Sequence, residues 1–210
     1  MSLTKKAYAA IKSKIVSCEY PPDTILNESK LMTELGVSRT PIREALSKLE
    51  HEGLVRVLPK RGILVSGFSL GDIREIFQVR ELLEPYIIQV WGSRMATDAL
   101  EGLRARLLKS PHEVPEADLY QLDNDLHRSL YDQCENKHFV SLLDKVFDQN
   151  HRIRIQSGRI EHRLEETQAE HLLIVEKLLK GDTAEAAEAM KAHLQRSRQA
   201  AFESLMLGKS

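Results

Sequence analysis

Cysteine is scarce in this sequence of 210 residues, which contains only Cys18 and Cys134. Two cysteines so far apart, in no metal-like spacing, argue against a disulfide framework and favour a reducing compartment. Long apolar runs are missing as well, because none approaches the roughly 18 residues that a membrane span requires. The N-terminus also lacks the apolar core of a signal peptide. We therefore expect a cytoplasmic protein that does not enter a membrane.

The chain as a whole lacks an excess of either charge, since its formal net charge is −1. Its parts differ, however. Residues 1–67 carry 11 Lys and Arg against 7 Asp and Glu, whereas the remainder carries 19 against 24. A basic first segment and an acidic remainder indicate two domains, of which only the first suits nucleic-acid phosphates. We place the linker at Ser66-Gly67, which gives domains 1–67 and 68–210.

The run VSRTPIREAL, from Val37 to Leu46, predicts a DNA recognition helix that begins near Arg39. Gly36 permits a bend after an upstream helix over 28–35. Ser38 is the expected N-cap, and Pro41 fits the first helical turn. The apolar positions Ile42, Ala45, Leu46 and Leu49 would face a core, which leaves Arg39, Thr40, Arg43 and Ser47 on the other side. That polar face can lie in the major groove, where arginine pairs with guanine edges and hydroxyls hold phosphates.

A hairpin wing is expected after this helix. Two β-prone runs, 54–57 and 63–65, flank a turn that contains Pro59, Lys60 and Arg61. The basic side chains of Lys60 and Arg61 would reach the DNA backbone or minor groove. A helix from Thr4 to Ser17 should pack beneath the recognition pair. The predicted DNA-contacting residues are Ser38, Arg39, Thr40, Pro41, Arg43, Lys60, Arg61 and Gly62.

From Ser69 onward the apolar residues recur at helical spacing. We expect six helices, at about 70–92, 98–109, 117–135, 138–157, 161–180 and 182–207. Ser69 with Asp72 should form a capping box at the first of them. The predicted fold class is therefore mainly α, with an N-terminal winged helix-turn-helix followed by an all-α antiparallel helical bundle.

Four polar side chains fall within the apolar stripes of these helices. They are Asp123 and His127, one turn apart on one helix, and His171 and His193 on two others. A carboxylate or an imidazole that faces the core must be paired or bound to something, because burying it alone is costly. Each histidine alone is more simply a hydrogen-bonded residue, but their joint placement favours a site for Zn²⁺, Ni²⁺ or Mn²⁺.

At this point the residues match a known family. VSRTPIREAL with downstream EGLV and RG resembles the winged helix-turn-helix of the GntR family of bacterial transcription regulators. The rest is similar to the FCD effector domain of the FadR-like branch, in VRELLEP (79–85), Asp123 with His127, Glu170-His171 leading to Gly181-Asp182, and Ala192-His193-Leu194. The resemblance implies that Asp123, His127, His171 and His193 hold a divalent ion, with His151 and His162 as the alternative ligands.

Members of this family commonly sense small organic acids, which directs attention to inward polar groups. Arg80 lies in an apolar stripe, where a buried guanidinium needs an anionic partner. Glu84, one turn later, supplies an ion pair that we favour slightly over direct effector contact, and both can hold. Asn150 and Arg154 share a helical face with Phe147. The candidate effector-binding residues are thus Arg80, Asn150 and Arg154.

The sequence therefore predicts a ligand-responsive bacterial transcription regulator and not an enzyme. We expect a repressor released by a small carboxylate metabolite, acting as a homodimer on double-stranded operator DNA with two-fold symmetry. One alternative is a metal-dependent enzyme that uses the Asp/His cluster, although no spare Glu, Ser or Cys is placed as base or nucleophile. The other is a constitutive DNA binder whose helical domain only dimerises.

Overall fold

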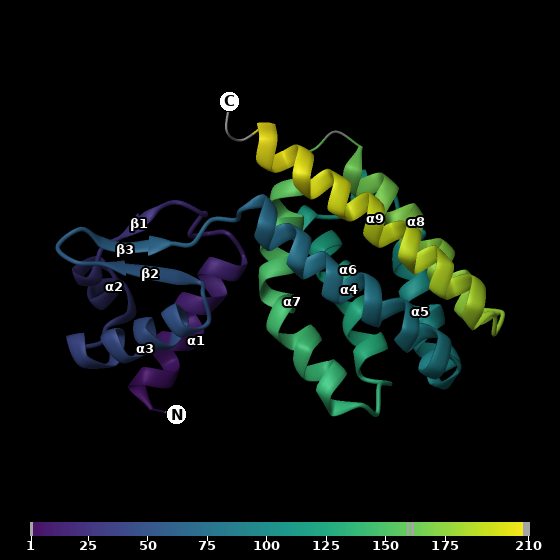
Figure 1. Cartoon of the computed structure of the whole chain (residues 1–210), viewed down its shortest axis with the longest axis horizontal. Coiled ribbons are helices and arrows are strands. Elements are labelled where there is room, and N and C mark those ends of the chain that lie inside the picture. The colour runs from purple at the N-terminus through teal and green to yellow at the C-terminus, as the bar shows by residue number, and fades with distance from the viewer. Residues whose placement is uncertain (1, 159, 161, 208–210) are drawn as a thin grey trace. The chain divides into compact units, whose positions relative to one another are not determined.

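The computed structural model describes residues 2–158, 160 and 162–207, and the chain divides after Phe68 into two compact units. A small sheet belongs to the N-terminal unit, whereas the C-terminal unit is built from helices (Figure 1). The predicted fold class is confirmed. Residues 1, 159, 161 and 208–210, which the expected domain and helix boundaries include, lie outside the described residues. Every helix in the described part is too short or too polar to cross a membrane.

The N-terminal unit is a winged helix-turn-helix. It consists of α1 (Leu3–Val16), β1 (Ile25–Leu26), α2 (Glu28–Leu35), α3 (Arg39–His51), β2 (Val55–Leu58) and β3 (Gly62–Val65). The three strands form an antiparallel sheet in the order β1-β3-β2, with Leu26 and Val57 both paired to Ile63. Strand β1 is absent from the sequence-based prediction because two residues are too few to show a period of two. The hairpin of β2 and β3 lies where the sequence places it.

The turn between α2 and α3 follows the expected chemistry with one exception. Gly36 ends α2 in the left-handed region with φ of 63°, where glycine has no steric penalty. Ser38 occupies the N-cap position of α3, but its hydroxyl makes no capping hydrogen bond. Pro41 lies in the first turn and is buried together with Ile42. The start of α3 therefore depends on the turn and on burial more than on a side-chain cap.

The tip of the wing is a tight turn closed by the Arg61 N–H, which donates to the Leu58 carbonyl at 3.0 Å. Lys60 sits within it at φ of 63°. Gly62, at φ of 118°, follows directly, and a Cβ there would come within 2.7 Å of the Leu26 carbonyl oxygen. Gly62 is thus required by the close approach of β1. The side chains of Pro59, Lys60 and Arg61 are exposed at the tip, and the last two carry positive charge.

The C-terminal unit contains helices α4 (Leu70–Trp91), α5 (Thr97–Leu107), α6 (Glu116–Tyr131), α7 (Lys137–Ser157), α8 (Arg163–Leu179) and α9 (Thr183–Leu207), with 3-10 turns at Gly92–Arg94 and Pro111–Glu113. The predicted capping box of Ser69 and Asp72 is present at the start of α4. Helix α6 ends at Tyr131, short of the expected residue 135. The reason is local, because the N–H groups of Gln133 and Cys134 donate to carbonyls three residues back, in a turn. Asn136 then caps α7 by accepting the His138 N–H at 3.0 Å.

Helix α9 packs along α4 and α8, and α6 contacts α4, α5, α7 and α8 (Figure 1). The apolar core between them includes Ile87, Ile88, Leu126, Leu143, Ile174, Val175, Met190 and Leu194, each at most 1% exposed. Burying such a side chain contributes about 1.5–3 kcal/mol. The same inward faces also carry charged and imidazole groups, which cannot contribute to the apolar core.

Candidate metal centre and nucleic-acid interface

The structure brings together the four residues that the sequence nominates as metal ligands. Asp123 and His127 come from α6, His171 from α8 and His193 from α9, and all four are buried. One ligand atom from each lies within 4.8 Å of those of the others. The alternatives are not part of this group. His151 instead meets Asn124 at 3.1 Å, and His162 meets Glu165 at 2.9 Å at the exposed start of α8.

Two buried carboxylates fix which nitrogen of the histidines faces inward. Glu84 Oε2 lies 2.7 Å from Nδ1 of His127, and Glu170 Oε2 lies 2.7 Å from Nδ1 of His193. A carboxylate oxygen can only accept, so each Nδ1 carries the proton and each Nε2 keeps its lone pair. Carboxylates in this outer position orient metal-binding imidazoles in many proteins. Glu84 and Glu170 therefore prepare both rings as ligands through Nε2.

The inner atoms of the cluster face one another at short distances. Nε2 of His171 lies 3.2 Å from Nε2 of His193 and 3.5 Å from Oδ1 of Asp123. Within the described residues neither Asp123 oxygen accepts a hydrogen bond, although Arg154 Nη1 forms an ion pair with Oδ2. Burial lowers the pKa of His171 and of His193 well below the ordinary value, so both are neutral. Converging lone pairs and one carboxylate fit a borderline divalent ion.

Arg80 anchors the carboxylate behind His127. Its Nε donates to Glu84 Oε1 at 2.6 Å, its Nη1 donates to Asn150 Oδ1 at 2.7 Å, and the Tyr131 hydroxyl donates to the same Glu84 oxygen at 2.8 Å. Burial alone would raise the pKa of Glu84, but Arg80 and His127 together hold it below its ordinary value. The ion pair of Arg80 with Glu84, which the sequence favours over effector contact, is therefore present.

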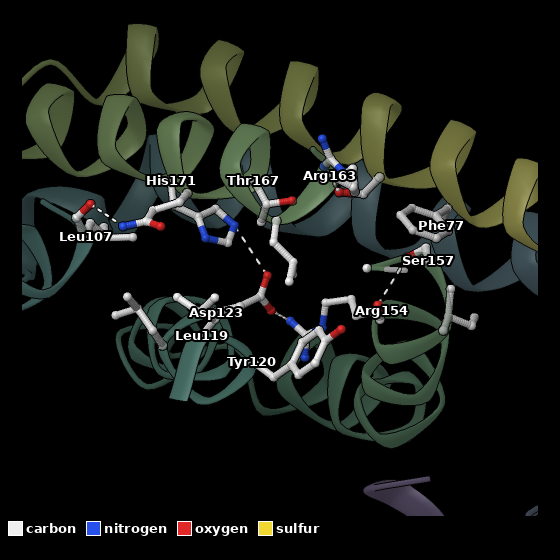
Figure 2. Close-up of a pocket in the computed structure, with 16 residues that line it drawn as sticks. Phe77, Leu107, Leu119, Tyr120, Asp123, Arg154, Ser157, Arg163, Thr167 and His171 are labelled. Carbon is white, nitrogen blue, oxygen red and sulfur yellow. Dashed lines mark hydrogen bonds and ion pairs between the residues drawn. The ribbon is translucent and has the colours of Figure 1, made fainter. Parts of the chain in front are cut away.

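A cavity of about 40 Å³ reaches this cluster, and its lining includes Asp123, His171 and Arg154. Figure 2 shows Asp123 between His171 and Arg154. Burial lowers the pKa of Arg154 to about 9, so the guanidinium stays charged at neutral pH. No described residue accepts a hydrogen bond from its Nε. Of the three candidate effector residues, Arg154 lines this cavity, whereas Arg80 and Asn150 are engaged with Glu84 and with each other.

Arg163 is a lining residue that the sequence analysis does not identify. It is 5% exposed, donates to both oxygens of Glu170 at 3.0 Å and also donates to Ser197 Oγ at 2.9 Å. Through Glu170 it is connected to His193. Its only signal in the sequence is its position seven residues before Glu170, which places both on the same face of one helix, and that spacing is too common to single it out.

The N-terminal unit presents the residues expected to contact DNA, with two differences. Ser38, Arg39, Thr40 and Arg43 are exposed at and just before the start of α3, and Lys60 and Arg61 are exposed on the wing. Pro41 is instead buried and Gly62 is half-buried beneath β1. Both therefore act on the backbone that carries the contacting side chains. The exposed set combines hydroxyl and guanidinium donors, which suits phosphate and base-edge contacts.

Two families match this chain over most of its length. Residues 3–65 match the bacterial regulatory proteins of the gntR family, and residues 75–196 match the FCD domain. YdhC of Bacillus subtilis, an uncharacterized HTH-type transcriptional regulator, is 28% identical over 190 residues, which cover 89% of this chain and 85% of YdhC. The HTH-type transcriptional repressor RspR of Escherichia coli K12 is 26% identical over 196 residues, covering 92% and 86%.

Solved structures share the fold. A GntR transcriptional regulator from Rhodococcus sp. RHA1 matches with a TM-score of 0.82 at 18% identity, covering 97% of this chain and 99% of its own. The Zn²⁺-bound FCD domain of TM0439 matches with a TM-score of 0.56 at 20% identity, covering 67% and 98%. At these identities the likeness concerns the fold, and the bound zinc is a property of TM0439.

Proposed function

The chain belongs to the GntR family of bacterial regulatory proteins and carries an FCD domain, and from that premise we propose that it represses transcription until a small carboxylate enters its helical domain. Membership makes the protein a DNA-binding transcriptional regulator. RspR, a relative named as a repressor, supports the sign of regulation. The relatives of this chain that carry names are regulators. This supports a role for the Asp/His cluster in sensing a ligand and not in catalysing a reaction.

One observation carries the sensing part of the proposal. The cavity that reaches Asp123 and His171 is also lined by Arg154, whose buried guanidinium faces the same space (Figure 2). A carboxylate is the natural partner for a buried arginine, because a planar guanidinium can donate two parallel hydrogen bonds to it. A neutral or cationic ligand would offer this guanidinium no carboxylate besides that of Asp123. The cavity lining therefore favours an organic anion.

The residues proposed to hold a divalent ion, Zn²⁺, Ni²⁺ or Mn²⁺, are Asp123, His127, His171 and His193. When bound, such an ion supplies a positive centre with positions open to an oxygen ligand. The protein's own part is to keep three imidazoles neutral and to direct them with Glu84 and Glu170. Arg154, which pairs with Asp123 in the structure, would turn to the carboxylate of the effector.

An effector can relieve repression only by binding the DNA-competent and incompetent arrangements with different affinity. Couplings of this kind are typically about 1–3 kcal/mol. The cavity itself, at about 40 Å³, holds little more than water. An organic acid must therefore displace side chains such as Arg154 on entry. That displacement would make the effector bind one arrangement of the protein more tightly than the other, and DNA affinity would change as a result.

We also propose that the regulator acts as a homodimer on two-fold symmetric operator DNA. Along α4, Leu82, Tyr86 and Val90 recur every four residues and are 74%, 48% and 44% exposed, and Leu142 on the neighbouring α7 is 45% exposed. The Tyr86 ring also meets Phe139 of α7 edge to face, with centroids 5.9 Å apart. An apolar stripe of this kind on a soluble protein is typical of an interface. A second copy of the same stripe is its self-complementary partner.

The metal part of the proposal is tested by elemental analysis of the purified, tag-free protein and of His171→Ala. We expect close to one Zn, Ni or Mn per chain in the wild type and little in the variant. A matched control is His138→Ala, an exposed histidine at the start of α7. No metal in the wild type, even after resupply of each ion, would contradict the metal site and leave the DNA-binding function standing.

The effector part is tested by thermal shift and DNA binding with a panel of mono-, di- and tricarboxylic acids on the metal-loaded chain. A ligand at 100 times its Kd should stabilise the protein by about 2.7 kcal/mol, and the same acid should weaken DNA binding. Arg154→Met should lose both responses, whereas Arg106→Gln, which removes an exposed arginine paired with Asp125, should keep them. A constitutive DNA binder predicts that no acid changes DNA affinity. An enzyme predicts that an acid is consumed.

A further inference from the structure

The two arginines at the start of the recognition helix share one acidic partner. Arg43 Nε donates to Glu28 Oε1 at 2.7 Å and Arg43 Nη2 donates to Glu28 Oε2 at 3.4 Å. Arg39 Nε lies 3.7 Å from the same Oε1. The arginine side chains are 65% and 60% exposed, whereas that of Glu28 is 25% exposed. A carboxylate is thus placed beside a surface that is expected to meet phosphates.

Glu28 is not needed as the side-chain cap of its own helix. It is the first residue of α2, where the positive end of the helix favours a carboxylate. The N-terminal N–H groups of α2, however, are capped by Asn27, whose Oδ1 accepts from Ser29 at 2.8 Å and from Lys30 at 3.3 Å. Within the described part of the chain, both hydrogen bonds that the Glu28 side chain accepts come from Arg43. The Glu28 side chain is therefore oriented toward α3.

We propose that Glu28 is a specificity-determining positioning residue, which holds the Arg43 guanidinium in one orientation for reading a guanine edge. This inference rests on the DNA-binding function above. Glu28 engages Nε and one N–H of Nη2, which leaves both N–H groups of Nη1 and the second of Nη2 available. That free end has the geometry that pairs with O6 and N7 of guanine. An unrestrained arginine would have to lose more side-chain entropy on binding.

The same carboxylate should weaken binding to DNA in general, because it places a negative charge near the phosphates. Glu28 therefore has opposite effects on two measurable quantities. It lowers affinity for random DNA, and it raises the preference for DNA with a guanine at the correct position. A residue needed only for folding would change both affinities in the same direction.

The experiment uses the full chain to select sequences from a pool of duplexes with a randomised central segment. The enriched sequence and a scrambled duplex are then titrated with wild type, Glu28→Gln and Glu28→Ala. Glu44→Gln is the matched control, since it removes an exposed carboxylate of α3 that accepts a hydrogen bond from Thr4 at 2.7 Å. Thermal melting of each variant reports on folding.

We expect the preference for the enriched over the scrambled duplex to fall about tenfold in Glu28→Gln and further in Glu28→Ala, in line with the loss of one good base contact. Affinity for the scrambled duplex should stay equal or rise, and Glu44→Gln should keep the wild-type preference. An unchanged preference in both Glu28 variants overturns the inference. So does a parallel loss of both affinities with a lower melting temperature. If the wild type enriches no sequence, the DNA-reading function fails first and the inference falls with it.

Discussion

Replacing Glu170 by glutamine tests whether a carboxylate outside the cluster prepares it for metal. Glu170 Oε2 accepts the Nδ1–H of His193 at 2.7 Å, and its side chain is only 7% exposed. A buried hydrogen bond to a charged acceptor contributes about 1.5–3 kcal/mol. Losing outer-sphere partners of this kind typically lowers metal affinity 10–100-fold, which corresponds to about 1.4–2.7 kcal/mol. The two ranges agree, so we expect a loss of this size for Glu170→Gln.

The assay is a competitive titration of Zn²⁺ between the full-length, tag-free protein and a chromophoric chelator. Glu166→Gln is the matched control, because Glu166 also pairs with Arg163, at 3.3 Å, but its side chain is 62% exposed. It should bind Zn²⁺ within about twofold of wild type, as expected for a weak surface pair. Unfolding in urea, measured without metal, separates any loss of stability from the loss of affinity. Equal Zn²⁺ affinity in Glu170→Gln and Glu166→Gln would refute the positioning role of Glu170.

Three further predictions follow from the same contacts. Arg43→Ala should lower affinity for the selected DNA by about 1–3 kcal/mol and relax sequence preference, as measured by fluorescence anisotropy; binding like wild type to selected and random DNA would contradict the recognition assignment. Glu84→Gln should destabilise the helical domain by about 3–5 kcal/mol in urea unfolding, because Arg80 then lacks its buried anionic partner, and a change near zero would show that the pair is dispensable. Tyr86→Asp should convert dimers to monomers in light scattering, whereas Leu173→Asp, an equally exposed leucine on α8, should not; a dimeric Tyr86→Asp would place the interface elsewhere.

The local sequence pattern was sufficient to predict the DNA-binding unit. The N-cap position of Ser38, the bend at Gly36 and the apolar spacing from Ile42 to Leu49 all lie within one short stretch. Helix α2 covers the residues expected for it, and α3 begins at Arg39 as expected. Helix periodicity and turn chemistry depend on neighbours in the chain, so they can be read without the fold. Strand β1 could not be found in this way, because its two residues become a strand only through pairing with β3.

Tertiary packing also changed the meaning of single residues. Gly62 was expected to contact DNA, yet its φ and the nearby Leu26 carbonyl give it a structural reason to be glycine. Arg43 was expected on the exposed face, and it is there, but its partnership with Glu28 joins two helices. Such roles depend on which backbone or side chain approaches from another element. That information is not contained in the spacing of one helix.

The candidate site shows how much the sequence by itself can determine. It determined that Asp123, His127, His171 and His193 face inward, because each occupies the apolar face of its own helix, and a polar group there must have a partner. Only the tertiary structure decided that Glu84 and Glu170 direct two of the imidazoles, and that Arg154 lines the cavity while Arg80 supports Glu84. The face of a helix is fixed by a period of 3.6 residues, whereas partners on other helices are fixed by how the helices pack.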